Sequence, residues 1–286
     1  MSLRDVRALA RKRPEQEFVL NRIYGAHVSP FVTVVCLRLG LSPDQVTLLG
    51  GASGAAGVAL LFLPLGWWSL VGILLLQVGY VLDFSDGQVA RMTGRTSVAG
   101  SYLDWLTHFY IPVAMALAAA TSVAGASGSH FWIVVGTLAG LELAAFVFSC
   151  KEHVLVAMQR DDPGLGSTAA FHAALRDDAR PADVTTAAAG AVPPTSGIPG
   201  RGHGPTVRSI IGELLIYPGS VHLMTLAVVT DLAFQATGVP PPWIARGALL
   251  CLWAVLLPVH VIATGRRNHR LISAVERRRR TERDEA

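Results

Sequence analysis

The sequence predicts an all-α, polytopic membrane protein, and three observations support this class. Half of its 286 residues are hydrophobic and only 15% are charged, whereas a soluble domain usually has about a quarter of its residues charged. Several stretches of near-uniform apolar character are long enough to cross a hydrocarbon core about 30 Å thick. The basic residues also fall on one side of these stretches.

We expect about six transmembrane helices, at residues 45–65, 68–88, 102–124, 130–150, 210–237 and 243–264. With the N-terminus in the cytoplasm, every Lys and Arg except Arg246 lies on the cytoplasmic side, and the turns at 63–66 and 125–128 are nearly uncharged. This asymmetry predicts that both termini are cytoplasmic. It also explains the net charge of +4 without a nucleic-acid partner, so none is expected.

The chain divides into three predicted parts. Residues 1–44 form an interfacial amphipathic segment, whose apolar face is predicted from helical spacing; the face comprises Phe18, Val19, Ile23, Tyr24, Phe31, Val32 and Val35. Residues 45–265 form the transmembrane domain, interrupted by a cytoplasmic, partly disordered loop at 159–208 that is rich in Ala, Gly, Pro and Thr. Residues 266–286 form a basic cytoplasmic tail against anionic lipid headgroups.

Polar residues gather where the second predicted span meets the third. Asp83 and Asp86 share a helical face, as do Asp104 and His108, and the short segment between them is compatible with a helical hairpin. Carboxylates that cluster without matching cations need a positive partner, and oxygen ligands favour Mg²⁺ or Mn²⁺. Arg91 adds a donor suited to phosphate. Together these groups indicate phosphoryl-group transfer at a divalent-metal site.

The segment DFSDGQVARMTGRTSVAGSYLDWLTH, residues 83–108, resembles the signature of the CDP-alcohol phosphotransferases. That signature is D-xx-D-G-xx-A-R, eight residues, then G-xxx-D-xxx-D, and every position matches except the last. LSPDQVTLLG, residues 41–50, also resembles the family's Pro-Asn-x-x-Thr opening of the first span, with Asp44 in place of Asn. The resemblance is strong in motif over residues 42–108 and extends in layout over roughly residues 18–265.

The resemblance implies an enzyme that moves a phosphate-linked alcohol from a CDP-alcohol to an acceptor hydroxyl and releases CMP. It implies a site with two Mg²⁺ or Mn²⁺ ions, facing the cytoplasm of a bacterial inner (plasma) membrane, in a homodimer. The metal ligands would be Asp83, Asp86, Asp104 and His108. The nucleotide site would include Thr47, Asp83, Gly87, Ala90, Arg91 and Gly100. The catalytic residues would be His108 and Asp104.

His108 stands where the family has its fourth Asp. Imidazole suits base catalysis near pH 7 and also binds metals, though Mg²⁺ less readily. We therefore expect a working enzyme with His108 as base. The alternative is a catalytically degenerate membrane protein of the same fold that binds CDP or lipid without turnover.

The acceptor and the donor stay open. The donor is either CDP-diacylglycerol, which would place the enzyme in phospholipid biosynthesis, or a soluble CDP-alcohol. The acceptor is a polyol phosphate or a lipid. Polar residues in other spans are candidates for the acceptor pocket, namely Glu142, Glu152, His153, Glu213, Tyr217 and His222. A membrane prenyltransferase would need a second Asp-rich motif, which the spans do not contain.

Overall fold

The computed structural model describes residue 6 and residues 26–95, 98–160 and 219–284, and in these residues helix is the only regular secondary structure. The all-α class is therefore confirmed. The helices are α2 (Ala26–Arg38), α3 (Pro43–Leu61), α4 (Trp67–Thr93), α5 (Val98–Ser127), α6 (Phe131–Arg160), α9 (Ser220–Thr237) and α10 (Ile244–Asp284).

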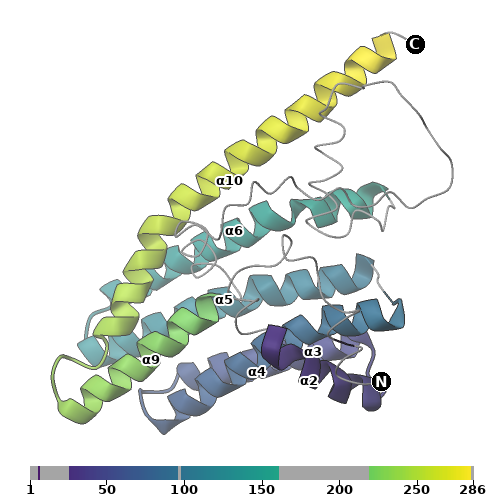
Figure 1. Ribbon diagram of the computed structural model, residues 1–286. Helices are drawn as coiled ribbons and strands as arrows, with labels where there is room; N and C mark the ends of the chain where they lie inside the picture. Colours follow the sequence, from purple (N-terminus) through teal and green to yellow (C-terminus); the bar gives the residue numbers. More distant parts are fainter. Residues whose placement is uncertain (1–5, 7–25, 96–97, 161–218, 285–286) are drawn as a thin grey trace.

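The helices run mostly as antiparallel neighbours (Figure 1). α3 packs most extensively on α4, and α5 on α6, while α10 contacts α5, α6 and α9. α2 lies against α4, and α4 also contacts α9. The ends of α4 and the start of α5 are thereby brought beside the start of α3.

Four helical stretches are long and apolar enough to cross a membrane, and they confirm a polytopic membrane protein. These stretches are Trp67–Thr93, Tyr102–Ser127, Phe131–Phe148 and Ile244–Ala263. α3 and the described α9 occupy the first and fifth predicted spans, but polar residues such as Asp44, Gln45, His222 and Asp231 lower their hydropathy. The number of six spans stays a prediction.

Several helices extend beyond the predicted spans, α4, α6 and α10 among them. α4 continues to Thr93, beyond the predicted end at residue 88, so both aspartates and Arg91 lie on one helix. α10 runs without a break to Asp284, so the backbone of the predicted basic tail continues the last helix. The predicted loop at 159–208 lies outside the described residues from residue 161 onward, as does most of the segment before residue 26.

One apolar core joins six helices between the two ends of the bundle. Its fully buried members include residues from five of these helices, and they are Leu76, Met115, Leu143, Met224, Leu250, Trp253 and Leu257. Large apolar side chains also cover the outside, such as Leu74 and Val255. An apolar exterior of this kind is what a lipid environment requires of a membrane-spanning bundle.

Glycines allow the backbones of α3 and α4 to approach closely. A Cβ added at Gly57 would lie 2.6 Å from the carbonyl oxygen of Gly72, and one added at Gly79 would lie 2.9 Å from that of Gly50. No side chain fits at such distances. Small residues commonly mediate close helix pairs in membranes, and this pair fixes the position of the aspartate-bearing helix.

A buried ion pair links three helices at the end of the bundle opposite the aspartates. Arg246 is 3% exposed and Asp231 is 0% exposed; Arg246 Nε donates to Asp231 Oδ2 at 2.6 Å, and its Nη1 donates to Ser122 Oγ at 2.6 Å. Asp231 also accepts hydrogen bonds from the backbone N–H groups of Ala245 and Arg246. Arg246, the basic residue that breaks the charge asymmetry, is therefore neutralised inside the protein.

Candidate functional site: a carboxylate and histidine cluster

Three of the predicted polar residues, Asp83, Asp104 and His108, form a cluster at one end of the bundle, between α4 and α5. His108 Nε2 lies 3.0 Å from Asp83 Oδ1 and 3.2 Å from Asp104 Oδ1. The three donor atoms all lie within 4.8 Å of one another. The side chains of Asp83 and His108 are only 13% and 14% exposed, and that of Asp104 is 30% exposed. The cluster is thus accessible to a ligand but largely shielded from water.

Local sequence explains why the two helices present these side chains together. Asp83 lies about three turns before the end of α4, and the helix ends at Gly94 with a φ of +66° and an N–H bonded to the carbonyl of Ala90. A left-handed glycine is a common end to a helix. The chain reverses within a few residues, and Asp104 and His108 follow one turn apart near the start of α5.

Asp86 has a different partner from Asp83, Asp104 and His108. Its Oδ2 accepts a hydrogen bond of 2.6 Å from Thr47 Oγ1 on α3, and Asp86 lies outside the three-donor group. It is still close enough for the charges of Asp83 and Asp104 to act on it. The structure therefore gathers three of the four predicted metal ligands tightly and ties the fourth to α3.

The start of α3 positions Thr47. Ser42 Oγ accepts from the N–H of Gln45 at 3.2 Å, while the Gln45 side chain accepts from the N–H of Ser42 at 2.8 Å. This reciprocal pair is a capping box, and it makes Ser42 the N-cap of α3. Thr47 is buried one turn later and faces Asp86.

α3 also approaches α5 at the level of the cluster. A Cβ at Gly51 would lie 2.8 Å from Thr107 Cγ2, and one at Gly54 would lie 3.1 Å from Ile111 Cδ1. Thr107 itself donates to the carbonyl oxygen of Asp104 at 2.8 Å. The small residues of α3 thus set how near α5 stands to α4.

A buried polar network that the sequence reasoning missed fastens α2 to the aspartate-bearing turn of α4. Gln88 accepts a hydrogen bond from Thr33 at 2.7 Å and donates one to Ser29 at 2.7 Å. Ser85 donates to the carbonyl of Val81 and, at 3.4 Å, to that of Ser29. Ser85 and Gln88 flank Asp86 in the sequence. This position was the signal from which the network could have been predicted. Phe31 and Val35, two residues of the predicted apolar face, are exposed on α2.

The residues expected at the nucleotide site lie on the same end of the bundle. Gly87 and Ala90 follow Asp86 on α4, and Gly100 lies in the first turn of α5. The Arg91 guanidinium folds over Gly87, where Nη1 stands 3.2 Å from the position a Cβ would take. A side chain at residue 87 would therefore crowd this fork-shaped donor beside the aspartates.

His222, a candidate for the acceptor pocket, lies in a contact between α4 and α9. Gln77 Nε2 is 3.2 Å from His222 Nδ1 and 2.9 Å from Thr225 Oγ1. The Tyr80 ring meets the His222 ring edge to face, with centroids 4.7 Å apart. Glu142 is half-buried on α6. The side chains of Glu152, His153, Glu213 and Tyr217 lie outside the described part of the chain.

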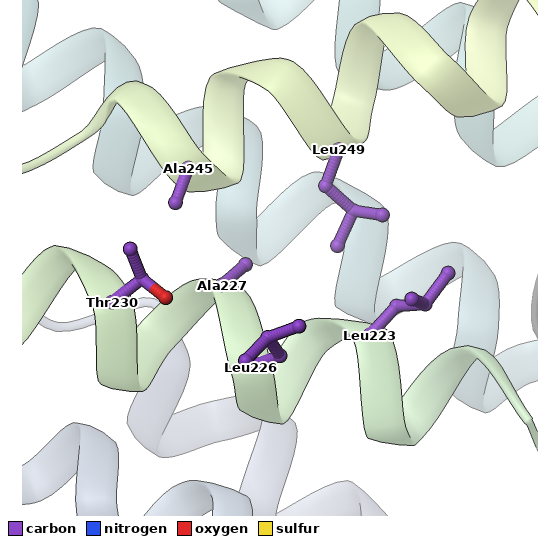
Figure 2. A pocket seen from close by; sticks show the side chains of 6 residues that line it. All are labelled: Leu223, Leu226, Ala227, Thr230, Ala245 and Leu249. Carbon is purple, nitrogen blue, oxygen red and sulfur yellow. The ribbon is translucent and has the colours of Figure 1, made fainter.

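An apolar pocket of ≈ 210 Å³ lies elsewhere, between α9 and α10 (Figure 2). Its lining is Leu223, Leu226, Ala227, Thr230, Ala245 and Leu249. None of these residues comes from α4 or α5. The pocket therefore has no part in the carboxylate and histidine cluster.

The cluster has a donor set that fits a divalent cation. Two carboxylate oxygens and an imidazole nitrogen converge from two helices, and both donor types bind divalent metals in proteins.

Comparison with known proteins identifies the domain. Residues 41–175 match the sequence model of the CDP-alcohol phosphatidyltransferase family. These residues, a little under half of the chain, thus resemble a CDP-alcohol phosphatidyltransferase domain. The resemblance in the 83–108 motif is thereby confirmed, and the matched residues include α3, α4 and α5 with the whole cluster.

Several known proteins are similar to part of this chain. The inner membrane protein YnjF of Escherichia coli (strain K12) is 34% identical over 136 residues, which are 45% of this chain and 61% of that protein. A phosphatidylinositol phosphate synthase of Streptomyces avermitilis is 44% identical over 79 residues, 27% of this chain and 30% of the synthase. An archaetidylinositol phosphate synthase of Aeropyrum pernix is 36% identical over 90 residues, 30% of this chain and 44% of the synthase. The chain thus covers less than two thirds of the length of each.

Proposed function

We propose that this protein is an integral membrane transferase that moves a phosphate-linked alcohol from a CDP-alcohol to an acceptor hydroxyl and releases CMP. The observation that carries the proposal is the convergence of Asp83, Asp104 and His108 inside a CDP-alcohol phosphatidyltransferase domain. CDP-diacylglycerol is the donor that fits a membrane-embedded site and the synthase names among the relatives. The acceptor is a polyol phosphate or a lipid.

In this proposal each residue acts on a defined part of the reaction. Asp83, Asp104 and His108 hold divalent metal, with Asp86 beside them, and the metal supplies positive charge to the diphosphate. Arg91 binds a phosphate oxygen through its guanidinium, and Gly87, Ala90 and Gly100 leave room for the nucleotide.

The acceptor oxygen attacks the phosphorus that carries the alcohol. A new phosphorus–oxygen bond forms there as the bond to CMP breaks, and CMP leaves with the bridging oxygen. The proton of the acceptor hydroxyl passes to a base at the cluster, for which Asp104 and His108 are the candidates.

The decisive experiment measures CMP release by purified protein across a panel of CDP-alcohol donors and hydroxyl acceptors. We expect release with CDP-diacylglycerol that requires a divalent cation and is lost in Asp83→Asn and Asp104→Asn. Asp284→Asn, at the far end of α10, is the matched control and should keep wild-type activity. Undiminished release in the two cluster variants, or after chelation, would refute the proposal.

One outcome would be a protein that binds CDP yet releases no CMP with any donor and acceptor pair. That result would replace the proposed transferase with the alternative, a catalytically degenerate binding protein. The homodimer that the family implies is tested on the same samples by light scattering of the detergent-solubilised protein. A mass of one chain after subtraction of bound detergent would contradict that part of the proposal.

A further inference from the structure

His108 directs one nitrogen at two carboxylates. Its Nε2 lies 3.0 Å from Asp83 Oδ1 and 3.2 Å from Asp104 Oδ1. A neutral imidazole nitrogen carries at most one hydrogen, so it can donate fully to only one of these oxygens. If Nε2 instead carries a lone pair, all three atoms are acceptors and need a cation among them.

The two separations from His108 Nε2 are compatible with those of neighbouring ligands around one ion. Two ligands at right angles, each about 2.1 Å from an octahedral divalent metal, stand about 3.0 Å apart. The two measured separations, 3.0 and 3.2 Å, are close to this value. The donors come from α4 and α5, which Gly51 and the glycine pairs of α3 hold in place.

We propose that His108 Nε2 is a metal ligand and makes this site select Mn²⁺ over Mg²⁺. The inference rests on the proposed function only in taking the cluster as a divalent-metal site. Carboxylate oxygens alone suit Mg²⁺, a hard ion that dehydrates reluctantly. An imidazole nitrogen strengthens binding of first-row transition metals far more than that of Mg²⁺. The one position at which this chain departs from the family signature thus changes the chemistry of the ion.

The same geometry excludes one catalytic role for His108, that of the base. A nitrogen whose lone pair binds a metal cannot also accept the proton of the acceptor hydroxyl. Asp104, the most exposed of the three side chains, then becomes the group placed to receive that proton, since its second oxygen is not needed for the contact with His108.

The test measures metal binding without substrate, so it does not depend on catalysis. Chelator-treated protein is titrated with Mn²⁺ by electron paramagnetic resonance, and bound Mn²⁺ is then displaced with Mg²⁺. We expect tight Mn²⁺ binding and a pulsed-resonance coupling to ¹⁴N from His108. In His108→Asp the coupling disappears, and the Mn²⁺ preference over Mg²⁺ falls about tenfold or more.

His130→Asp is the matched control, because His130 is exposed at the opposite end of the bundle. It should keep both the ¹⁴N coupling and the preference for Mn²⁺. Since the coupling is measured in the wild type, the proposal stays testable even if His108→Asp fails to fold.

Three results would overturn the inference. One is Mn²⁺ binding to the wild type without ¹⁴N coupling, and another is an unchanged Mn²⁺ preference in His108→Asp. The third is metal binding by His108→Asp but not by the wild type, which would show that a protonated His108 occupies the site as a built-in cation. Failure to release CMP with intact Mn²⁺ selectivity would refute the proposed function and leave this inference standing.

Discussion

At the scale of single residues, Thr47 decides where Asp86 points. Its hydroxyl has one hydrogen and two acceptors within reach, Asp86 Oδ2 at 2.6 Å and the carbonyl of Pro43 at 3.2 Å. The shorter contact is to Asp86, so the hydroxyl hydrogen is directed at that side chain rather than at Pro43. Thr47 thereby connects the first turns of α3 to the aspartates of α4.

Removing this hydroxyl should weaken the enzyme. In Thr47→Val the side chain keeps its shape, but Asp86 loses its hydrogen bond, which is worth about 1.5–3 kcal/mol when one partner is charged. We expect kcat/KM for the CDP-alcohol to fall roughly tenfold or more, as measured by CMP release. Thr47→Ser retains the hydroxyl and should stay near wild type. Equal activity of the Val and Ser variants would show that the contact is dispensable.

The sequence alone could predict the cluster but not the position of Asp86. Asp83, Asp104 and His108 are near one another because of helical spacing and a short hairpin, both of which are local properties. The bond from Asp86 to Thr47 spans 39 residues and depends on how closely α3 packs. The network of Ser29 and Gln88 is likewise a long-range contact, which hydropathy patterns do not report.

At the scale of elements, close packing of α3 on α4 keeps the site in register. Gly57 and Gly72 face each other so closely that each would place a Cβ within 3 Å of the other's carbonyl oxygen. Because backbone atoms cannot move aside as a flexible side chain can, a methyl group there must separate the helices. Interiors are packed densely enough for such a shift to be felt.

Gly57→Ala should therefore destabilise the protein by about 1–3 kcal/mol through overpacking. Gly125→Ala is the matched control on α5, because a Cβ there would meet nothing within 4 Å; it should be neutral or stabilise by up to about 1 kcal/mol. The unfolding temperature of both variants in detergent tests this difference. An equal or smaller loss at Gly57 would contradict the close approach of the two helices.

At the scale of the whole molecule, the two ends of the bundle handle charge differently. The end with the cluster displays Arg38, Arg91 and Arg95 on its surface. At the other end, Arg246 is buried against Asp231 and Ser122. The pair joins α5, α9 and α10, so it is expected to stabilise the bundle far from the chemistry.

Asp231→Asn should lower the free energy of unfolding by about 3–5 kcal/mol, because it leaves the Arg246 guanidinium buried without its counter-charge. The double variant Asp231→Asn with Arg246→Met removes both charges but keeps an acceptor for the backbone N–H groups of Ala245 and Arg246, and it should recover most of that loss. Chemical unfolding in detergent measures both, and CMP release at low temperature should change little in the folded fraction. A double variant no more stable than Asp231→Asn would argue against the ion pair as the cause.

The sidedness of the molecule follows from the same contrast. Exposed arginines at the cluster end predict that this end faces the cytoplasm, because basic residues flanking transmembrane helices are retained on that side. His130 and Arg95 are exposed at opposite ends of the bundle, so each can report one side of the membrane. In a chain without its native cysteines, we expect His130→Cys in intact spheroplasts to react with a membrane-impermeant maleimide. Arg95→Cys should react only after the membrane is permeabilised. The reverse pattern would place the cluster outside the cell, where a CDP-alcohol made in the cytoplasm could not reach it.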